Sequence, residues 1–203
     1  MKIISLLGCG KIGIPLALKL LQNNYIVKGS TTTESKIDKL KEMGILPYLI
    51  NITEKINLDF FNADILVVTL PFKKTFDDPS IYKNYINILS NCIKSSSIKH
   101  VVFTSSSSVY SKEDYECTVT AKINPYSERS KVLLDCERII YNLENISKII
   151  IRLGGLYGSG RKITRSQSKR RLISNNDAVD LLFKCVNKNG QNQIINGFKR
   201  MIY

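Results

Sequence analysis

Hydrophobic and polar positions along the chain alternate between short, continuously apolar runs and longer stretches in which apolar residues recur with helical spacing. Continuous runs are typical of strands buried on both faces, and the longer pattern is typical of amphipathic helices. The apolar runs predict strands at Lys2–Leu7, Tyr25–Val27, Leu46–Ile50, Ala63–Leu70, His100–Thr104, Lys148–Ile151 and Gln193–Asn196. The helical pattern lies between these runs, in residues 14–21, 36–43, 79–95, 124–140 and 176–186.

Strands that alternate with helices favour a parallel, doubly wound sheet with right-handed crossovers and helices on both faces. The chain has 203 residues and shows no internal repeat, linker or low-complexity tail. This length is sufficient for one sizeable core. We therefore predict a single α/β domain over residues 1–203.

A glycine motif stands between the first predicted strand and the first predicted helix. Residues 8–13 read Gly-Cys-Gly-Lys-Ile-Gly, a G-x-G-x-x-G. In a strand–turn–helix setting, the first glycine allows a tight turn, the second lets backbone amides approach a pyrophosphate, and the third lets helix and strand pack closely. This predicts a Rossmann-type fold that binds a dinucleotide through Gly8, Gly10, Lys11, Ile12 and Gly13, although a glycine-rich turn in an ordinary α/β domain is the alternative.

The residues after the second predicted strand bear on which dinucleotide would bind. Sites that prefer NAD usually place an acid here for the ribose hydroxyls. This chain has Thr31 and Thr32 instead, its first acid is Glu34, and Lys36 is nearby. The pattern favours NADP slightly over NAD, whereas the alternative is a solvated turn that caps the next helix. Two residues at the end of the fourth predicted strand, Leu70 and Pro71, are further expected cofactor contacts.

Three later segments carry a family resemblance. The fifth strand runs into Thr104-Ser-Ser-Ser-Ser-Val-Tyr110, a second segment reads Tyr126-Ser-Glu-Arg-Ser-Lys131, and a third runs from Arg152 to Arg161 with the pattern R-x-x-x-x-Y-G-x-G. Together with the glycine motif, these segments resemble the extended short-chain dehydrogenase/reductases, the NAD-dependent epimerase/dehydratase group, and most closely its small atypical members. The resemblance covers about residues 1 to 161.

The resemblance implies catalytic roles for Ser106, Tyr126 and Lys131. Ser106 would hydrogen-bond the reacting oxygen, Tyr126 would donate and accept the proton, and Lys131 would lower the pKa of the phenol and hold the cofactor ribose. The family separates its tyrosine and lysine by four positions, whereas five separate them here. One extra residue rotates a helical side chain by about 100°. If Lys131 keeps its register, Ser127 occupies the tyrosine position.

The C-terminal part is shorter than the resemblance leads one to expect. Residues 161–171 contain six basic residues and no acid, and Leu172–Val179 already resembles a later family segment, with Ser174 in place of a histidine. We therefore expect residues 161–203 to form a curtailed substrate lobe. The basic segment would either bind a phosphorylated or nucleotide-linked substrate or form a solvated loop.

Composition narrows the classes of partner. The net charge of +13 comes from basic residues spread over the whole chain, and no aromatic-and-basic reading motif accompanies it, so nucleic-acid binding is disfavoured. No apolar run is long enough to span a membrane.

The five cysteines lack C-x-x-C spacing, and no metal site is expected. Seven residues before Gly8 are too few for an exported leader, so we expect a cytoplasmic location with reduced thiols.

Two classes of function remain open. The first is an NAD(P)-dependent oxidoreductase or epimerase that acts on a small or nucleotide-linked substrate, such as a nucleotide sugar. The second is a non-catalytic NAD(P)-binding sensor or partner-binding protein whose Tyr–Lys site has degenerated. The resemblance also implies that a homodimer can form.

Overall fold

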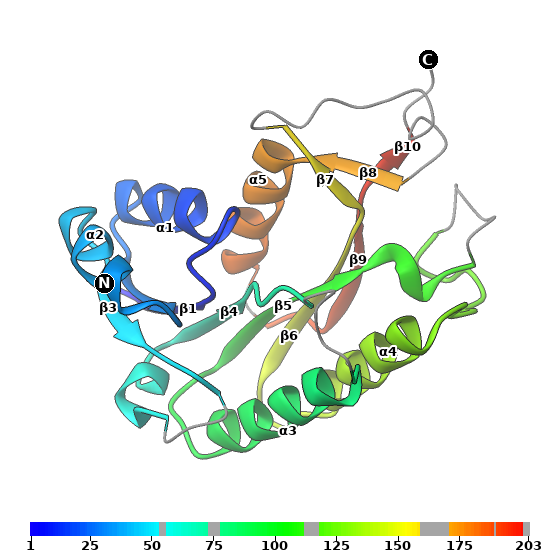
Figure 1. Ribbon diagram of the computed structural model, residues 1–203, viewed down its shortest axis with the longest axis horizontal. Helices are drawn as coiled ribbons and strands as arrows, with labels where there is room; N and C mark the ends of the chain where they lie inside the picture. The colour runs from blue at the N-terminus through cyan, green and yellow to red at the C-terminus, as the bar shows by residue number, and fades with distance from the viewer. Residues whose placement is uncertain (53–55, 73–77, 112–117, 159–170, 189, 201–203) are drawn as a thin grey trace.

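The predicted doubly wound sheet is confirmed in a computed structural model, which describes residues 1–52, 56–72, 78–111, 118–158, 171–188 and 190–200. Seven parallel strands form the main sheet in the order β3-β2-β1-β4-β5-β6-β9 (Figure 1). Their bounds are β1 Ile3–Leu7, β2 Ile26–Thr31, β3 Leu46–Leu49, β4 Ile65–Val68, β5 His100–Ser106, β6 Ser147–Leu153 and β9 Gln193–Gly197.

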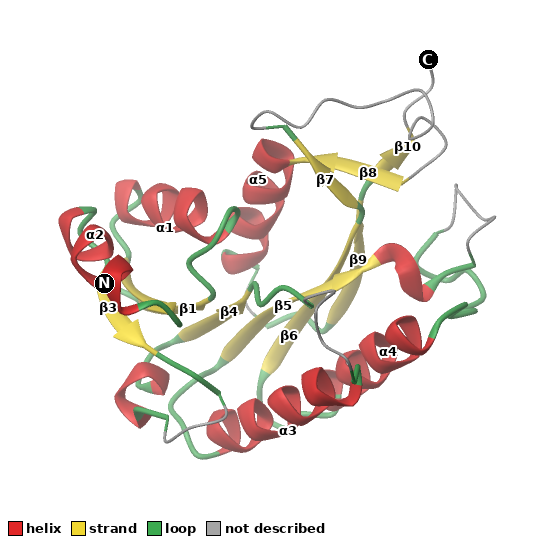
Figure 2. Ribbon diagram, in the orientation of Figure 1, coloured by secondary structure: helices red, strands yellow, loops and turns green. Residues whose placement is uncertain are grey.

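Helices cover both faces of this sheet. The α-helices are α1 Gly13–Gln22, α2 Ile37–Glu42, α3 Ser80–Lys94, α4 Glu128–Tyr141 and α5 Asn175–Val186. Figures 1 and 2 show α1, α2 and α5 on one face and α3 and α4 on the other. Each layer has its own apolar core, and the central strands supply side chains to both cores, which explains why these strands read as continuous apolar runs.

The start of α4 differs from the predicted helix. The pattern predicts a helix from residue 124, but α4 begins at Glu128. Ser127 has an extended backbone, and its side-chain oxygen accepts a hydrogen bond from the backbone N–H of Ser130 (3.1 Å). This bond is an N-cap, which satisfies one amide that the helix start leaves open. Tyr126 therefore precedes the helix.

The C-terminal region is divided between two sheets. β9 joins the main sheet beside β6, whereas β8 (Arg171–Ser174) lies between β7 (Gly155–Tyr157) and β10 (Lys199–Arg200) in a small second sheet. Short 3-10 helices span Glu34–Lys36 (η1), Leu58–Phe61 (η2) and Ser107–Val109 (η3). Ser174, at the family's histidine position, caps α5 by accepting from the N–H of Asp177 (3.0 Å). Except for Arg171, the basic segment 161–171 lies outside the described residues.

His100 anchors the start of β5 to two neighbouring elements. Its Nε2 lies 3.0 Å from the carbonyl oxygen of Cys185 in α5, and its Nδ1 lies 2.7 Å from the Ser147 hydroxyl in β6. A carbonyl only accepts, so Nε2 carries the proton. Burial lowers the pKa of His100, which keeps the ring neutral in this structural role.

The described cysteines, Cys9, Cys92, Cys136 and Cys185, are free thiols. Burial raises the pKa of Cys9 and of Cys136 to about 12 and that of Cys185 to about 11, so these three are packing residues and not reactive thiolates. None of the helices in the described ranges combines the length and the hydropathy that a membrane span requires.

Candidate functional site

A cleft of about 850 Å³ crosses the carboxyl ends of the central strands. Its lining comes from the glycine loop after β1, the ends of β2, β4, β5 and β6, and the start of α4. Open parallel sheets bind ligands at this edge, because the strand order reverses there and leaves a crevice between neighbouring loops. The cleft is therefore the candidate site.

The glycine loop has three glycines in three different situations. Gly8 has φ +112°, a conformation that favours glycine. A Cβ on Gly13 would lie 2.1 Å from the Gly8 carbonyl oxygen, so the third glycine is needed for close packing. A Cβ on Gly10 would meet no described atom within 4 Å, because it would project into open space. The fold thus requires Gly8 and Gly13, whereas Gly10 leaves room for a ligand at the backbone.

Two residues outside the motif hold this loop in place. The Ser30 hydroxyl at the end of β2 accepts from the N–H of Gly8 (2.9 Å), and the Ser30 carbonyl accepts from the N–H of Cys9 (2.8 Å). The Thr69 hydroxyl after β4 donates to the Gly8 carbonyl (2.8 Å). Ser30 and Thr69 were not among the predicted site residues. The only signal in the sequence was their place near the carboxyl ends of two predicted strands: Ser30 three residues after Val27, and Thr69 next to the last residue of Ala63–Leu70.

The predicted cofactor contacts come together along the cleft, with one exception described below. Gly8, Gly10, Lys11, Ile12, Gly13, Thr31, Thr32, Leu70 and Pro71 all line it. At the end near β2, Lys36 joins the two threonines, and the Thr31 hydroxyl accepts from the N–H of Thr33 (3.1 Å). No side chain in the described lining is acidic. The lysine and the hydroxyls at this end of the cleft can bind an anionic group. The described lining lacks the acid that usually binds the two ribose hydroxyls of NAD.

Two of the predicted catalytic residues share the other end of the cleft. Ser106 and Tyr126 both line it, and so does Ser127, the alternative occupant of the tyrosine position. The Ser106 hydroxyl accepts from the N–H of Ser108 (3.2 Å), which fixes its rotamer at the start of η3. Tyr126 is 55% exposed, so this residue stays open to solvent where it borders the cleft.

Lys131 is the exception among the predicted site residues. It is absent from the described lining of the cleft, and its ammonium lies 2.5 Å from the Glu128 carboxylate on the exposed side of α4. The residue four positions after Tyr126 is Ser130, which is buried and whose hydroxyl lies 2.8 Å from that of Ser127. Because α4 begins directly after Ser127, Ser130 lies on the side of the helix that faces the cleft. Lys131, one residue later, lies on the exposed side.

Arg129 lines the cleft but was not among the predicted site residues. Its guanidinium carbon lies 3.9 Å from the centroid of the Phe72 ring, and Phe72 stacks in turn on Tyr82 of α3, with centroids 4.5 Å apart and planes at 5°. The three groups form a layered stack between the end of β4, α3 and α4. Burial lowers the pKa of Arg129, but arginine remains charged at neutral pH. The cationic residue of α4 that lines the cleft is therefore this arginine.

A buried polar network lies beneath the Ser106 end of the cleft. Arg152 of β6 donates from Nη2 to Glu137 of α4 (2.7 Å) and from Nε to the same carboxylate (3.0 Å), and both side chains are almost fully buried. The Ser105 hydroxyl donates to Glu137 (2.6 Å), and Arg152 Nη1 donates to the Tyr110 hydroxyl (2.8 Å), which donates to Asn196 of β9 (2.9 Å). Burial alone would lower the pKa of Arg152, but its bonds to Glu137 raise it above the usual value.

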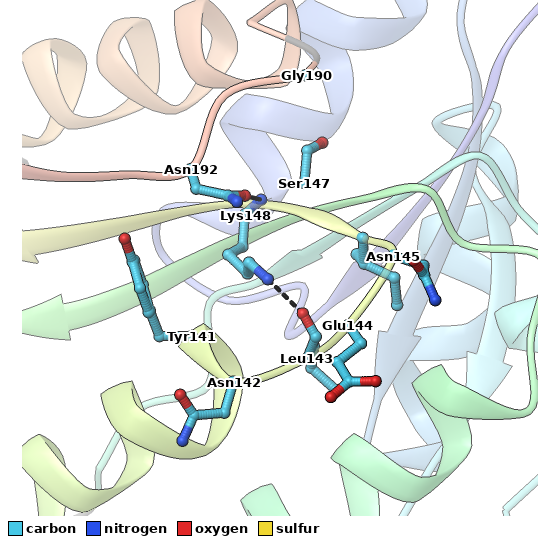
Figure 3. A pocket seen from close by; sticks show the side chains of 10 residues that line it. Tyr141, Asn142, Leu143, Glu144, Asn145, Ser147, Lys148, Gly190 and Asn192 are labelled. Carbon is cyan, nitrogen blue, oxygen red and sulfur yellow. Dashed lines mark hydrogen bonds between the residues drawn. The ribbon is translucent and has the colours of Figure 1, made fainter.

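A second cavity of about 640 Å³ lies at the opposite pole, where β6 begins. It is lined by residues 141–148 with Gly190 and Asn192 (Figure 3). The Lys148 ammonium donates to the Leu143 carbonyl, and Asn192 accepts from the Lys148 backbone N–H (3.1 Å). These contacts link Leu143 and Asn192 to the start of β6. The Leu143 carbonyl is a hydrogen-bond partner for the buried Lys148 ammonium. Among the described residues, no group of acidic, histidine or cysteine side chains could hold a metal ion.

One comparison with known proteins gives a relative by sequence. No family model matches the chain. Protein YeeZ of Escherichia coli K12 is 32% identical over 167 residues, which are 79% of this chain and 61% of YeeZ. The chain therefore spans about three-fifths of the length of that relative.

Solved structures share the fold at low sequence identity. MoeE5 in complex with UDP-glucose and NAD has a TM-score of 0.81 at 17% identity, over 98% of this chain and 76% of that one. UDP-glucuronic acid 4-epimerase from Bacillus cereus, in complex with NAD, has a TM-score of 0.80 at 18% identity, over 98% and 78% of the two chains. Helicobacter pylori ADP-L-glycero-D-manno-heptose-6-epimerase has a TM-score of 0.78 at 14% identity, over 97% and 76%. The chain has the fold of these proteins.

The Arg152–Glu137 pair generates a prediction about stability. Glu137→Gln keeps the shape of the side chain but leaves a buried guanidinium without its counter-charge. We expect the free energy of unfolding to fall by about 3–5 kcal/mol, as measured by urea denaturation. Glu128→Gln on the exposed side of the same helix is the control and should change it by less than about 1 kcal/mol. Equal effects of the two substitutions would refute a special role for the buried pair.

Proposed function

We propose that this chain is a member of the extended short-chain dehydrogenase/reductase superfamily and binds a nicotinamide dinucleotide in the cleft. The observation that carries the proposal is the glycine loop, in which Gly8 and Gly13 are closed to a side chain and Gly10 is open. That arrangement is what a pyrophosphate needs, because it brings the backbone and the N-terminus of α1 to the phosphates without a side chain between them. The fold shared with proteins solved in complex with NAD supports the same ligand.

The cleft residues divide by position along the dinucleotide. The amides of residues 10–13 and the Lys11 ammonium would hold the pyrophosphate, and Thr31, Thr32 and Lys36 would hold the adenosine half. Leu70 and Pro71, which follow β4, and Ser106, the last residue of β5, would contact the nicotinamide half. When bound, the nicotinamide supplies hydride transfer, and the protein supplies position and polarisation.

We propose that the protein is an oxidoreductase or epimerase that acts on a small or nucleotide-linked substrate. Ser106 would hydrogen-bond the reacting oxygen, and Tyr126 would exchange a proton with it. Lys131 can take part only by leaving Glu128, and an exposed pair of this kind costs about 0–1 kcal/mol to break. MoeE5 and the Bacillus cereus enzyme were solved with UDP-sugars or NAD, which supports a nucleotide-linked substrate class.

A non-catalytic dinucleotide-binding protein is the alternative function. It is favoured by one specific observation: Tyr126 lies outside α4 and is more than half exposed, while Lys131 is paired away from the cleft. Proton exchange by a tyrosine at neutral pH needs a positive charge close to the phenol, and Lys131 is not placed to supply it. With this function, the protein would sense the cofactor, or it would bind a partner protein while the cofactor occupies the cleft.

Dinucleotide binding predicts opposite effects for two glycines of the loop. Gly10→Ala should weaken NADPH binding at least about 10-fold, because the methyl would occupy the ligand's place, and should leave unfolding unchanged within about 0.5 kcal/mol. Gly13→Ala should destabilise the fold by about 1–3 kcal/mol, because its methyl meets the Gly8 carbonyl. Fluorescence titration and urea denaturation measure the two effects. Tight NADPH binding by Gly10→Ala would be incompatible with the proposed cradle.

Cofactor choice predicts a role for Lys36, since we propose NADP as the preferred form. Lys36→Glu should weaken NADPH binding about 10-fold or more through repulsion of the 2′-phosphate, and should change NADH binding much less. Lys39→Glu, an exposed position on α2 outside the described lining, is the charge-matched control. If both variants affect NADPH and NADH alike, the preference does not arise at Lys36.

Catalysis predicts a loss of turnover in Tyr126→Phe. NADPH oxidation with carbonyl substrates and NADP⁺ reduction with UDP-sugars should both fall by about 100-fold or more, while NADPH binding stays intact. Tyr141→Phe at the far end of α4 is the control and should retain activity. Wild-type protein that binds NADPH tightly but turns over none of these substrates would favour the non-catalytic function instead.

A further inference from the structure

The turn after β5 is held at both ends by one buried ion pair. At its start, the hydroxyl of Ser105 in β5 donates to the Glu137 carboxylate (2.6 Å). At its end, directly after η3, the hydroxyl of Tyr110 accepts from Arg152 Nη1 (2.8 Å). Arg152 donates to Glu137 in turn, from Nη2 (2.7 Å) and from Nε (3.0 Å). Ser105, Tyr110, Arg152 and Glu137 therefore form a clamp around residues 106–109.

The turn inside the clamp carries two side chains of the cleft. Ser105 pairs with Arg152 in the register of β5 and β6, so both side chains leave the sheet on the face that α4 covers. Side chains alternate along a strand, so the next residue, Ser106, points to the other face. Its hydroxyl accepts from the N–H of Ser108 (3.2 Å), and both serines line the cleft. The clamp thus restrains the backbone that carries Ser106 and Ser108 without using their own hydroxyls.

Burial strengthens the bonds of the clamp. All four of its side chains are buried, and two of them, Arg152 and Glu137, carry opposite charges. Hydrogen bonds to a charged group are stronger than bonds between neutral groups, and a buried site keeps water from competing for them. The Tyr110 hydroxyl also donates to Asn196 of β9 (2.9 Å). The turn is therefore tied to α4, β6 and β9 through two buried hydroxyls.

We infer that Ser105 and Tyr110 are positioning residues of the site, because the clamp determines where the Ser106 hydroxyl meets the nicotinamide half of a bound dinucleotide. The inference rests on the proposed function, in which Ser106 contacts that half. Ser105 and Tyr110 act through the turn and not by binding the cofactor. The adenosine half is assigned to the other end of the cleft, beside Thr31 and Lys36. Loosening the clamp should therefore affect one half of the ligand and spare the other.

Hydrogen exchange, measured by NMR on the free, full chain, tests the clamp itself. Ser105→Ala removes one hydroxyl and leaves the ion pair intact, so the buried charges stay paired. The amides of Ser108 and Tyr110, which bond to oxygens within the turn (3.2 and 3.3 Å), should exchange about 10-fold faster than in the wild type. Ser90→Ala is the control and should leave both amides unchanged, since Ser90 is an equally buried serine of α3 whose hydroxyl donates to a backbone carbonyl (2.8 Å).

Two ligands test what the clamp does, because NADPH has both halves and adenosine 2′,5′-bisphosphate lacks the nicotinamide. Ser105→Ala should weaken NADPH binding about 5-fold or more and leave the affinity for the bisphosphate within about 2-fold. Tyr110→Phe keeps the ring, loses the hydroxyl that binds Arg152, and should act in the same direction. Ser105→Thr keeps a hydroxyl and should retain NADPH affinity within about 2-fold of the wild type. Ser90→Ala should change neither affinity.

Each result has a separate meaning. Unchanged amide exchange in both Ser105→Ala and Tyr110→Phe would overturn the clamp. Equal weakening of the two ligands, or faster exchange with unchanged NADPH affinity, would overturn its role at the nicotinamide half. A Ser105→Thr variant that behaves like Ser105→Ala would contradict the role of the hydroxyl. Failure of the wild-type chain to bind NADPH would refute the proposed function, whereas exchange on the free chain would still decide whether the clamp holds the turn.

Discussion

The buried ion pair between Arg152 and Glu137 is the interaction on which the site depends. It joins β6 to α4, and through Ser105 and Tyr110 it extends to β5, the segment after η3 and β9. Removing two charges from water costs several kcal/mol each, and forked hydrogen bonds offset that cost only when the geometry is good. The pair therefore joins β6 to α4, and Ser105, which lines the cleft, is hydrogen-bonded to it.

The glycine loop illustrates a division between what a fold needs and what a ligand needs. Gly8 and Gly13 are required by backbone conformation and close packing even without a ligand, whereas Gly10 faces open space. Ser30 at the end of β2 and Thr69 directly after β4 hydrogen-bond the N–H and carbonyl groups of the loop from the two strands that flank β1. The proposed phosphate cradle is thus formed by three strand ends that meet, of which the motif describes only one.

The position of one helix start decides which cations reach the cleft. Because Ser127 caps α4, the helical phase begins at Glu128, which places Ser130 inward, Lys131 outward beside Glu128, and Arg129 against Phe72. Side chains on a helix differ by about 100° per residue, so Arg129 and Lys131, which are two residues apart, point in directions about 160° apart. The unusual spacing between Tyr126 and Lys131 is therefore accompanied by a different basic residue in the site.

The sequence by itself determined the parallel sheet, the order of its elements and the glycine loop, because apolar periodicity and glycine geometry are local properties. It also marked Tyr110 and Arg152 as parts of separate motifs. Only the tertiary structure decided that these two residues meet, that Ser30 and Thr69 hold the loop, and that Arg129 and not Lys131 lines the cleft. These features depend on contacts between residues far apart in the chain and on the phase of one capped helix, neither of which has a local signature.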